Sequence, residues 1–259
     1  MVQSPDPEPN VQTMAARPVA ARPVQRRRRH RCTALTIATL SLALLPQTSR
    51  AIPIPLASPE GLKLLSSSNA RSDYGSLAQE FLTQANLAYC GVASSVMVLN
   101  SLKQPAPAVS GYGDYHFWTQ DNLWSGTESA TVVKASQVQR QGMTLMELAT
   151  LLQSHGLVVE PIHGQTLDLE TFRQRLRQSL SDPSDRLLVN YNRQSLGQNG
   201  GGHISPVAAY HASSDQVLIL DVARYRYPTV WVPLRDLWQA IRTIDPSSGK
   251  SRGIVLIRR

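Results

Sequence analysis

Apolar residues at helical spacing predict several helices along the chain. A short helix is expected from Ser76 to Leu82, and a longer one from Gly91 to Leu102, where apolar residues recur every three or four positions among small ones. Thr144 to Glu147 form a capping box, which opens a helix that ends at His155-Gly156. Asp168 is the expected N-cap of the next helix. The inner faces of the last two predicted helices consist of Phe172, Leu176 and Leu180, and of Leu234, Leu237, Trp238 and Ile241.

Runs rich in β-branched and aromatic residues predict strands, most of them in the second half of the chain. Strands from His203 to Tyr210 and from Val217 to Asp221 flank the turn Ser213-Ser214-Asp215, so we expect a hairpin there. Further strands are expected at Leu157 to Ile162, Leu187 to Tyr191, Val230 to Val232 and Ile254 to Ile257. Helices first and mostly antiparallel strands second indicate an α+β fold.

Two segments show neither the helical spacing nor the strand pattern described above. Ile52 to Ser72 is rich in proline and serine, and we expect an irregular lead-in there. Gly111 to Ser129 is aromatic, contains glycine and is aperiodic. Such a composition is typical of a long ordered loop that lines a site.

The N-terminal segment indicates targeting rather than folding. A basic run from Arg26 to Arg31 precedes an apolar stretch from Leu35 to Leu45 and a small-residue exit at Ala51, as in a secretory signal peptide. The stretch is shorter than the about 20 apolar residues that a membrane span needs. We therefore expect a signal peptide in residues 1–51, cleaved near Ala51, and one catalytic domain in residues 52–259 of an exported, periplasmic protein. Met1 and Met14 are alternative starts.

The net charge of +8 at pH 7 changes this picture little, because much of the excess lies in the same basic run. A nucleic-acid-binding surface would need Lys and Arg spread over one folded face with aromatic residues between them. The sequence therefore gives no indication of a nucleic-acid partner.

Cysteine usage narrows the chemistry. Of the two cysteines, Cys32 lies in the signal segment, so the mature chain keeps Cys90 alone and forms no internal disulfide. Three roles are open to that thiol: it forms an intermolecular disulfide, it is buried and inert, or it is reactive. Cys90 opens a predicted helix, where backbone N–H groups and the helix dipole favour the thiolate. Gly91 would let a substrate carbonyl approach, and the Gln84 amide with the Cys90 N–H would stabilise an oxyanion.

His203 and Asp221 supply the partners that an activated thiol needs. His203 follows the glycine run Gly200 to Gly202, and Asp221 ends the next strand of the predicted hairpin, so the two can lie side by side. A carboxylate beside the imidazole fixes its tautomer and lets it act as a base and then as an acid. Taken singly, each residue also fits a structural role. The chain order Cys, His, carboxylate is that of papain-like enzymes.

The segments around these residues resemble the catalytic domain of phytochelatin synthases. They are Gln84 to Leu102, His203 to Tyr210, Asp221 to Pro228, and a tail with Trp231 to Leu234, Asp245 and Ser248 to Ile254. The similarity covers nearly all of the chain from about Pro53 to Arg259, and it implies a papain-like cysteine protease fold. By this resemblance Cys90 is the nucleophile, His203 the base, Asp221 the orienting group and Gln84 an oxyanion-hole donor.

The resemblance implies glutathione as both donor and acceptor. The Cys90 thiolate would attack the Cys–Gly peptide bond and glycine would leave. The γ-glutamylcysteinyl thioester would then pass to water or to a second glutathione, which gives phytochelatin. A γ-glutamyl group carries an amine and a carboxylate, and the resemblance places Asp245 and Arg252 there, with Arg224 and Gly202 nearby. The alternative for these charged residues is a surface ion pair.

The chain departs from plant-type members of that family, because it stops at Arg259 without a cysteine-rich C-terminal domain. It therefore resembles the short bacterial form, which is associated more with glutathione hydrolysis than with long-chain synthesis. No tightly bound cofactor is expected. A heavy-metal ion, cadmium or zinc, would enter as an activator or as a metal–thiolate substrate. The sequence leaves open that choice, the balance of hydrolysis and transfer, and a homodimer.

Other functional classes fit less well. The remaining histidines of the mature chain form no spaced His/Cys cluster of the kind that zinc needs, which argues against a metalloenzyme. They are His116, His155, His163 and His211. A periplasmic glutathione- or heavy-metal-binding protein without turnover stays open, and glycine release would separate it from an enzyme. A papain-like peptidase acting on another peptide, such as a bacteriocin leader, would not need a paired Asp245 and Arg252.

Overall fold

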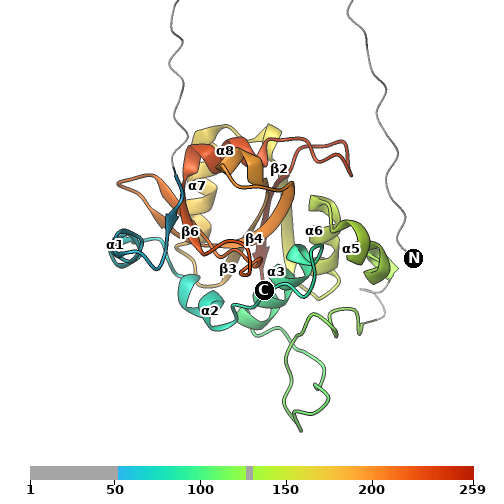
Figure 1. Cartoon of the computed structure of the whole chain (residues 1–259). Coiled ribbons are helices and arrows are strands. Elements are labelled where there is room, and N and C mark those ends of the chain that lie inside the picture. Colours follow the sequence, from blue (N-terminus) through green and yellow to red (C-terminus); the bar gives the residue numbers. More distant parts are fainter. Residues whose placement is uncertain (1–51, 127–130) are drawn as a thin grey trace, which may run out of the picture. The chain divides into compact units, whose positions relative to one another are not determined.

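The computed structural model describes residues 52–126 and 131–259, which are built around one antiparallel sheet (Figure 1). Its strands lie in the order β1-β6-β5-β4-β3-β7-β2. Every neighbouring pair is antiparallel, as the α+β prediction requires. The strands are β1 (Ile54–Pro55), β2 (Val158–His163), β3 (Asp185–Asn192), β4 (Gly202–His211), β5 (Gln216–Ile219), β6 (Val230–Pro233) and β7 (Gly253–Arg258).

Helices cover both faces of this sheet (Figure 1). On one face, α3 and α6 pack on alternate strand residues such as Leu188; on the other, α7 and α8 pack on their neighbours, Leu187 and Val189. Because both faces are buried, the central strands are apolar on both sides, and their sequences show runs rather than alternation. The helices are α1 (Pro59–Ser67), α2 (Tyr74–Gln79), α3 (Cys90–Ser101), α5 (Ala135–Gln141), α6 (Leu145–Gln153), α7 (Leu169–Ser179) and α8 (Leu234–Ile241).

The predicted helix caps are confirmed. The Thr144 hydroxyl accepts from the Glu147 N–H, and the Glu147 carboxylate accepts from the Thr144 N–H, which is the reciprocal capping box. Asp168 caps α7 by accepting from the Thr171 N–H at 2.8 Å. Past the end of α6, Gly156 has a φ of 80°, a conformation that glycine adopts at little cost.

The expectation of an irregular lead-in over Ile52 to Ser72 is wrong. The segment contains β1, which pairs with β6, and then α1. Ser58 caps α1 by accepting from the Gly61 N–H, and Pro59 occupies the first helical turn, where its missing N–H costs nothing. Proline and serine here start a helix rather than break one. The sequence also gave no sign of α5.

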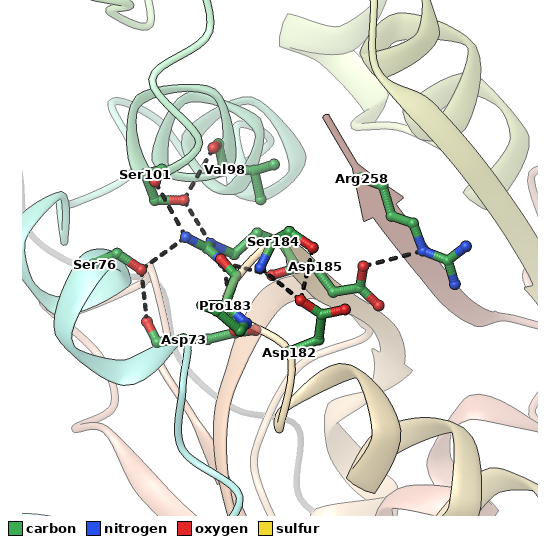
Figure 2. Close-up of polar contacts among 10 residues, drawn as sticks. Asp73, Ser76, Val98, Ser101, Asp182, Pro183, Ser184, Asp185 and Arg258 are labelled. Atoms are coloured by element: carbon green, nitrogen blue, oxygen red, sulfur yellow. Dashed lines mark hydrogen bonds and ion pairs between the residues drawn. The ribbon is translucent and has the colours of Figure 1, made fainter.

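A buried polar network ties the far end of α3 to the sheet (Figure 2). Arg186, at the start of β3, donates to the Ser101 hydroxyl and to the Ser101 carbonyl at the C-terminus of α3. It also donates to the Ser76 hydroxyl of α2 and, at 3.4 Å, to the Asp73 carboxylate. A cation at a helix C-terminus satisfies carbonyls that have no partner within the helix. The network therefore fixes the position of the helix that begins at Cys90.

The predicted signal peptide lies outside the described residues. Within residues 52–126 and 131–259, no helix combines the length and the apolar character that a membrane crossing requires.

Candidate active site

Cys90 is the first residue of α3, where the prediction placed it. Its side chain is buried and hydrogen-bonds to His203. Burial alone would raise the pKa of the Cys90 thiol, but the His203 hydrogen bond and charge, together with the backbone groups of Ile204 and Gly91, lower that pKa overall. The thiol is therefore set up to ionise more readily than an ordinary cysteine.

His203 and Asp221 lie side by side, as the hairpin prediction required. His203 follows Gly202 at the start of β4, and Asp221 comes just after β5, which ends at Ile219. His203 Nε2 lies 2.9 Å from Asp221 Oδ1, which leaves Nδ1 for the Cys90 sulfur. Burial lowers the pKa of His203, but its bonds to Asp221 and Cys90 raise it overall. The three side chains form a connected series, thiol to imidazole to carboxylate.

Arg193 completes this series, and the sequence did not indicate it. The residue follows β3 in a short 3-10 helix, Arg193–Leu196, and is buried. Its guanidinium donates to both oxygens of Asp221, at 2.7 and 2.9 Å. Burial would raise the pKa of Asp221, yet the bonds from His203 and Arg193 hold it far below its usual range. The one available signal was an arginine directly after an apolar strand.

A cleft of about 640 Å³ opens at Cys90 and His203. Loop residues before α3, the C-terminal end of α5 with the residues that follow it, the ends of β3 and β4, and the turn before β7 form its walls. None of the residues 111–126 lines it, so the aromatic loop expected there does not border this cleft. The lining consists of Asn86, Leu87, Ala88, Cys90, Gln139, Arg140, Gln141, Gly142, Met143, Asn190, Gly202, His203, Ile204, Asp245, Pro246, Ser247 and Arg252.

Asp245 and Arg252 lie together in this cleft, and both are buried. Arg252 Nη1 is 3.6 Å from Asp245 Oδ2 and donates to Asn190 Oδ1 at 2.9 Å. A Cβ on Gly202 would come within 2.1 Å of that guanidinium, so only glycine leaves room for it. Arg252 Nε and Asn190 Nδ2 are buried donors without a hydrogen-bond partner among the described residues. Such donors are costly unless an acceptor meets them.

Two other residues were singled out in the sequence, Arg224 and Gly91, and of these Arg224 lies away from the described cleft lining. The exposed Arg224 donates to the Phe81 carbonyl at 3.3 Å and is not part of the cleft lining. A Cβ on Gly91 would come within 2.5 Å of Met143 Cε and 3.2 Å of Ile204 Cδ1, so the glycine leaves room for these two side chains. Its role in substrate approach stays a prediction.

Gln84 is buried upstream of Cys90, and its backbone N–H donates to the Val222 carbonyl. Its side-chain Nε2 donates to the Asn86 carbonyl at 2.6 Å. One further N–H of that amide stays available, and the role of Gln84 as an oxyanion donor stays a prediction.

The described residues hold no group of three or more His, Cys, Asp or Glu side chains arranged to bind a metal ion. His116 and His163 instead contact the backbone carbonyls of Ala106 and Ser251.

The order Cys, His, Asp on this α+β scaffold can be compared with known proteins. The family model described as phytochelatin synthase matches residues 45–254, most of the chain. The chain belongs to the phytochelatin synthase family. The family assignment predicted from the sequence is confirmed, and the α+β architecture, with a cysteine opening a helix against a His-bearing sheet, agrees with the papain-like fold that it implied.

Curated relatives of this phytochelatin synthase family match at similar levels. Glutathione γ-glutamylcysteinyltransferase 3 of Lotus japonicus is 36% identical over 209 residues, which are 80% of this chain and 42% of the relative. Glutathione γ-glutamylcysteinyltransferase 2 of Arabidopsis thaliana is 34% identical over 224 residues, 85% of this chain and 48% of the relative. The Schizosaccharomyces pombe glutathione γ-glutamylcysteinyltransferase is 33% identical over 185 residues, 71% and 43% of the two chains. The chain thus spans less than half the length of these relatives.

One solved structure also aligns with the chain. A double glycine motif protease from an AMS/PCAT transporter, in complex with the leader peptide, is 14% identical and has a TM-score of 0.39. The alignment covers 68% of this chain and 89% of the protease.

Proposed function

We propose that this chain is a cysteine-nucleophile acyltransferase that cleaves glutathione and transfers its γ-glutamylcysteinyl part. The observation that carries the proposal is a buried Cys90 at a helix N-terminus, hydrogen-bonded to His203 and opening on a cleft that holds the Asp245–Arg252 pair. The relatives named glutathione γ-glutamylcysteinyltransferase support the same substrate.

The first half-reaction forms a thioester. The Cys90 thiolate attacks the carbonyl carbon of the Cys–Gly bond, and the carbonyl oxygen takes up negative charge. The Cys90 N–H and, on our hypothesis, the Gln84 amide stabilise that oxygen. His203, protonated in the thiolate–imidazolium pair, gives its proton to the departing glycine nitrogen as the C–N bond breaks. Cys90 then holds the γ-glutamylcysteinyl group through a C–S bond.

The second half-reaction releases that group. Neutral His203 takes a proton from water, or from the amine of a second glutathione, as the oxygen or nitrogen attacks the thioester carbon. The C–S bond breaks and its electron pair returns to the Cys90 sulfur, which restores the thiolate beside the imidazolium. Water gives γ-glutamylcysteine, and a second glutathione gives phytochelatin.

The charges of the cleft match those of glutathione. The γ-glutamyl end carries an ammonium and a carboxylate, which suit Asp245 and Arg252, and the buried donors Arg252 Nε and Asn190 Nδ2 suit the carboxylate oxygens. The glycine end carries a second carboxylate. The exposed Arg140 lines the same cleft, and its guanidinium has no ion pair or hydrogen bond within residues 52–126 and 131–259, so we assign the glycine carboxylate to it.

Purified protein incubated with glutathione tests the proposal, with free glycine as the readout. We expect glycine together with γ-glutamylcysteine or phytochelatin, and none from Cys90→Ser, whose fold circular dichroism would check. Parallel reactions with cadmium measure whether a metal–thiolate is the better substrate. Binding of glutathione without any glycine release would favour the non-catalytic binding protein. Glycine release by Cys90→Ser at the wild-type rate would exclude Cys90 as the nucleophile.

Export from the cytoplasm is part of the proposal and rests on the basic and apolar pattern between Arg26 and Ala51. The expected mature N-terminus lies near Ile52. Edman sequencing of protein isolated from its native cells checks this, and an N-terminus between Arg26 and Leu45 would contradict it.

A further inference from the structure

Asp221 occupies an unusual electrostatic position, because two cationic partners share one buried carboxylate. His203 approaches Oδ1, and the Arg193 guanidinium contacts Oδ1 and Oδ2 together. The Ala223 N–H also donates to Oδ1 at 2.9 Å. All three charged side chains are almost fully excluded from water. At such burial each charge strongly affects the protonation of its neighbours.

Arg193 itself is held by a dedicated set of contacts. Nη1 donates to Gln198 Oε1 at 2.6 Å, and the guanidinium stacks over the Tyr227 ring at 4.7 Å. The Arg193 backbone N–H donates to the Gly201 carbonyl, which anchors the glycine run that leads into His203. The arginine therefore links both ends of the His–Asp contact.

We propose that Arg193 is a positioning residue of the catalytic machinery, which neutralises the Asp221 carboxylate and so weakens the hold of His203 on its proton. A lone buried carboxylate would attract the imidazolium strongly and hinder proton transfer to the departing glycine amine. The Arg193–Asp221 pair carries no net charge. It therefore acts on His203 much as an uncharged amide would, while the two-pronged contact fixes the carboxylate plane.

The test measures alkylation of Cys90 rather than turnover of glutathione. A failure of the Arg193 proposal is therefore distinguishable from a failure of the proposed function. Iodoacetamide labelling of full-length protein is followed by mass spectrometry of the Cys90 peptide across pH. The rate changes in two steps, one as the thiolate forms and one as His203 loses its proton. We expect Arg193→Gln to move the His203 step to higher pH by roughly one pH unit or more, because the unopposed Asp221 carboxylate then stabilises the imidazolium.

Three further variants make the result decisive. In Asp221→Asn, Arg193 stands unopposed, and we expect the His203 step to move to lower pH. Adding Arg193→Gln to that variant should move the step back towards its wild-type position, because no unpaired buried charge remains. Arg226→Gln is the matched control. This exposed arginine stacks on the same Tyr227 ring at 5.5 Å without touching Asp221, so neither step should move.

Two outcomes would overturn the proposal. One is an Arg193→Gln protein that reacts more slowly with both steps unmoved, which is what a structural role predicts. The other, which stays measurable even if the single arginine variant fails to fold, is an identical His203 step in Asp221→Asn and in the double variant.

Discussion

At the residue scale, the candidate active site depends on a few charged side chains, and their interactions are strong because the side chains are buried. Cys90, His203, Asp221 and Arg193 form one line of alternating proton donors and acceptors, and Asp245 with Arg252 forms a second charged pair in the same cleft. Arg193 comes from the segment just after β3, distant in sequence from Asp221, whereas Asp245 and Arg252 lie close together in the sequence before β7. The role of each charged side chain therefore depends on the groups that it contacts in the folded protein.

Arg252→Ala should lower kcat/KM for glutathione by roughly 30-fold or more, because loss of one partner from a buried charged contact costs about 2–5 kcal/mol. Arg252→Lys should restore part of this, since an ammonium lacks the planar fork. Steady-state glycine release measures both. Arg224→Ala is the control, because Arg224 lies outside the cleft and should keep wild-type kinetics. An equal loss in Arg224→Ala would contradict the assignment of the γ-glutamyl pocket.

Arg140→Gln should raise the KM for glutathione by about two- to fivefold, the effect of an exposed ion pair. Glutathione esterified with ethanol at its glycine carboxylate is the substrate that tests this assignment. The ester keeps the rest of the molecule but lacks the negative charge that Arg140 is proposed to bind. Its KM should be the same for wild type and variant. If the KM for the ester rises in the variant as much as the KM for glutathione does, Arg140 does not bind the glycine carboxylate.

At the element scale, α3 is positioned from both of its ends. Its N-terminus presents Cys90 to His203, and its C-terminal Ser101 is held by Arg186 in the network of Figure 2. Burial raises the pKa of Asp73, in that network, to about 8, against the opposing charge of Arg186. The contact between them is long, and Asp73 Oδ2 has no hydrogen bond within the described part of the chain.

This carboxyl predicts how stability depends on pH. Because the folded-state pKa of about 8 exceeds the ordinary value of 3.8, the folded chain holds the Asp73 proton more tightly than the unfolded chain does. The stabilisation is complete below the ordinary pKa and is lost as pH rises towards 8, by about 1.4 kcal/mol for each pH unit in between.

Urea unfolding of wild type and Asp73→Asn, near pH 5 and near pH 8, checks this expectation. The free energy of unfolding should fall with pH in wild type and fall less in the variant, which has no proton to lose at this position. Parallel pH dependence in the two proteins would show that Asp73 titrates normally.

At the scale of the whole molecule, the sheet and the helices that cover it carry the described residues of the cleft. The sheet, both layers of helices and the described lining residues belong to residues 52–126 and 131–259.

A chain that begins at Ile52 should therefore fold cooperatively and release glycine from glutathione at the rate of the full chain. Thermal unfolding and the glycine assay, run on both proteins, measure this. A shortened chain that folds but loses most of its activity would show that the N-terminal segment takes part in catalysis.

The sequence by itself determined the features that depend on neighbouring residues. Helix caps at Thr144 and Asp168, the hairpin after His203, and a cysteine at a helix start follow from local backbone chemistry, and the long motifs determined the family. The sequence did not predict the start of α1, because Ser58-Pro59 is as typical of a turn as of a helix cap.

Only the tertiary structure decided which charged groups meet. Strand register brings Asn190 to Arg252 across 62 positions of sequence and Arg193 to Asp221 across 28. It also leaves Arg224, three residues beyond Asp221, outside the cleft. An arginine's partner depends on which strands pair and where the sheet twists its ends, and these are properties of the assembled sheet that no local pattern encodes.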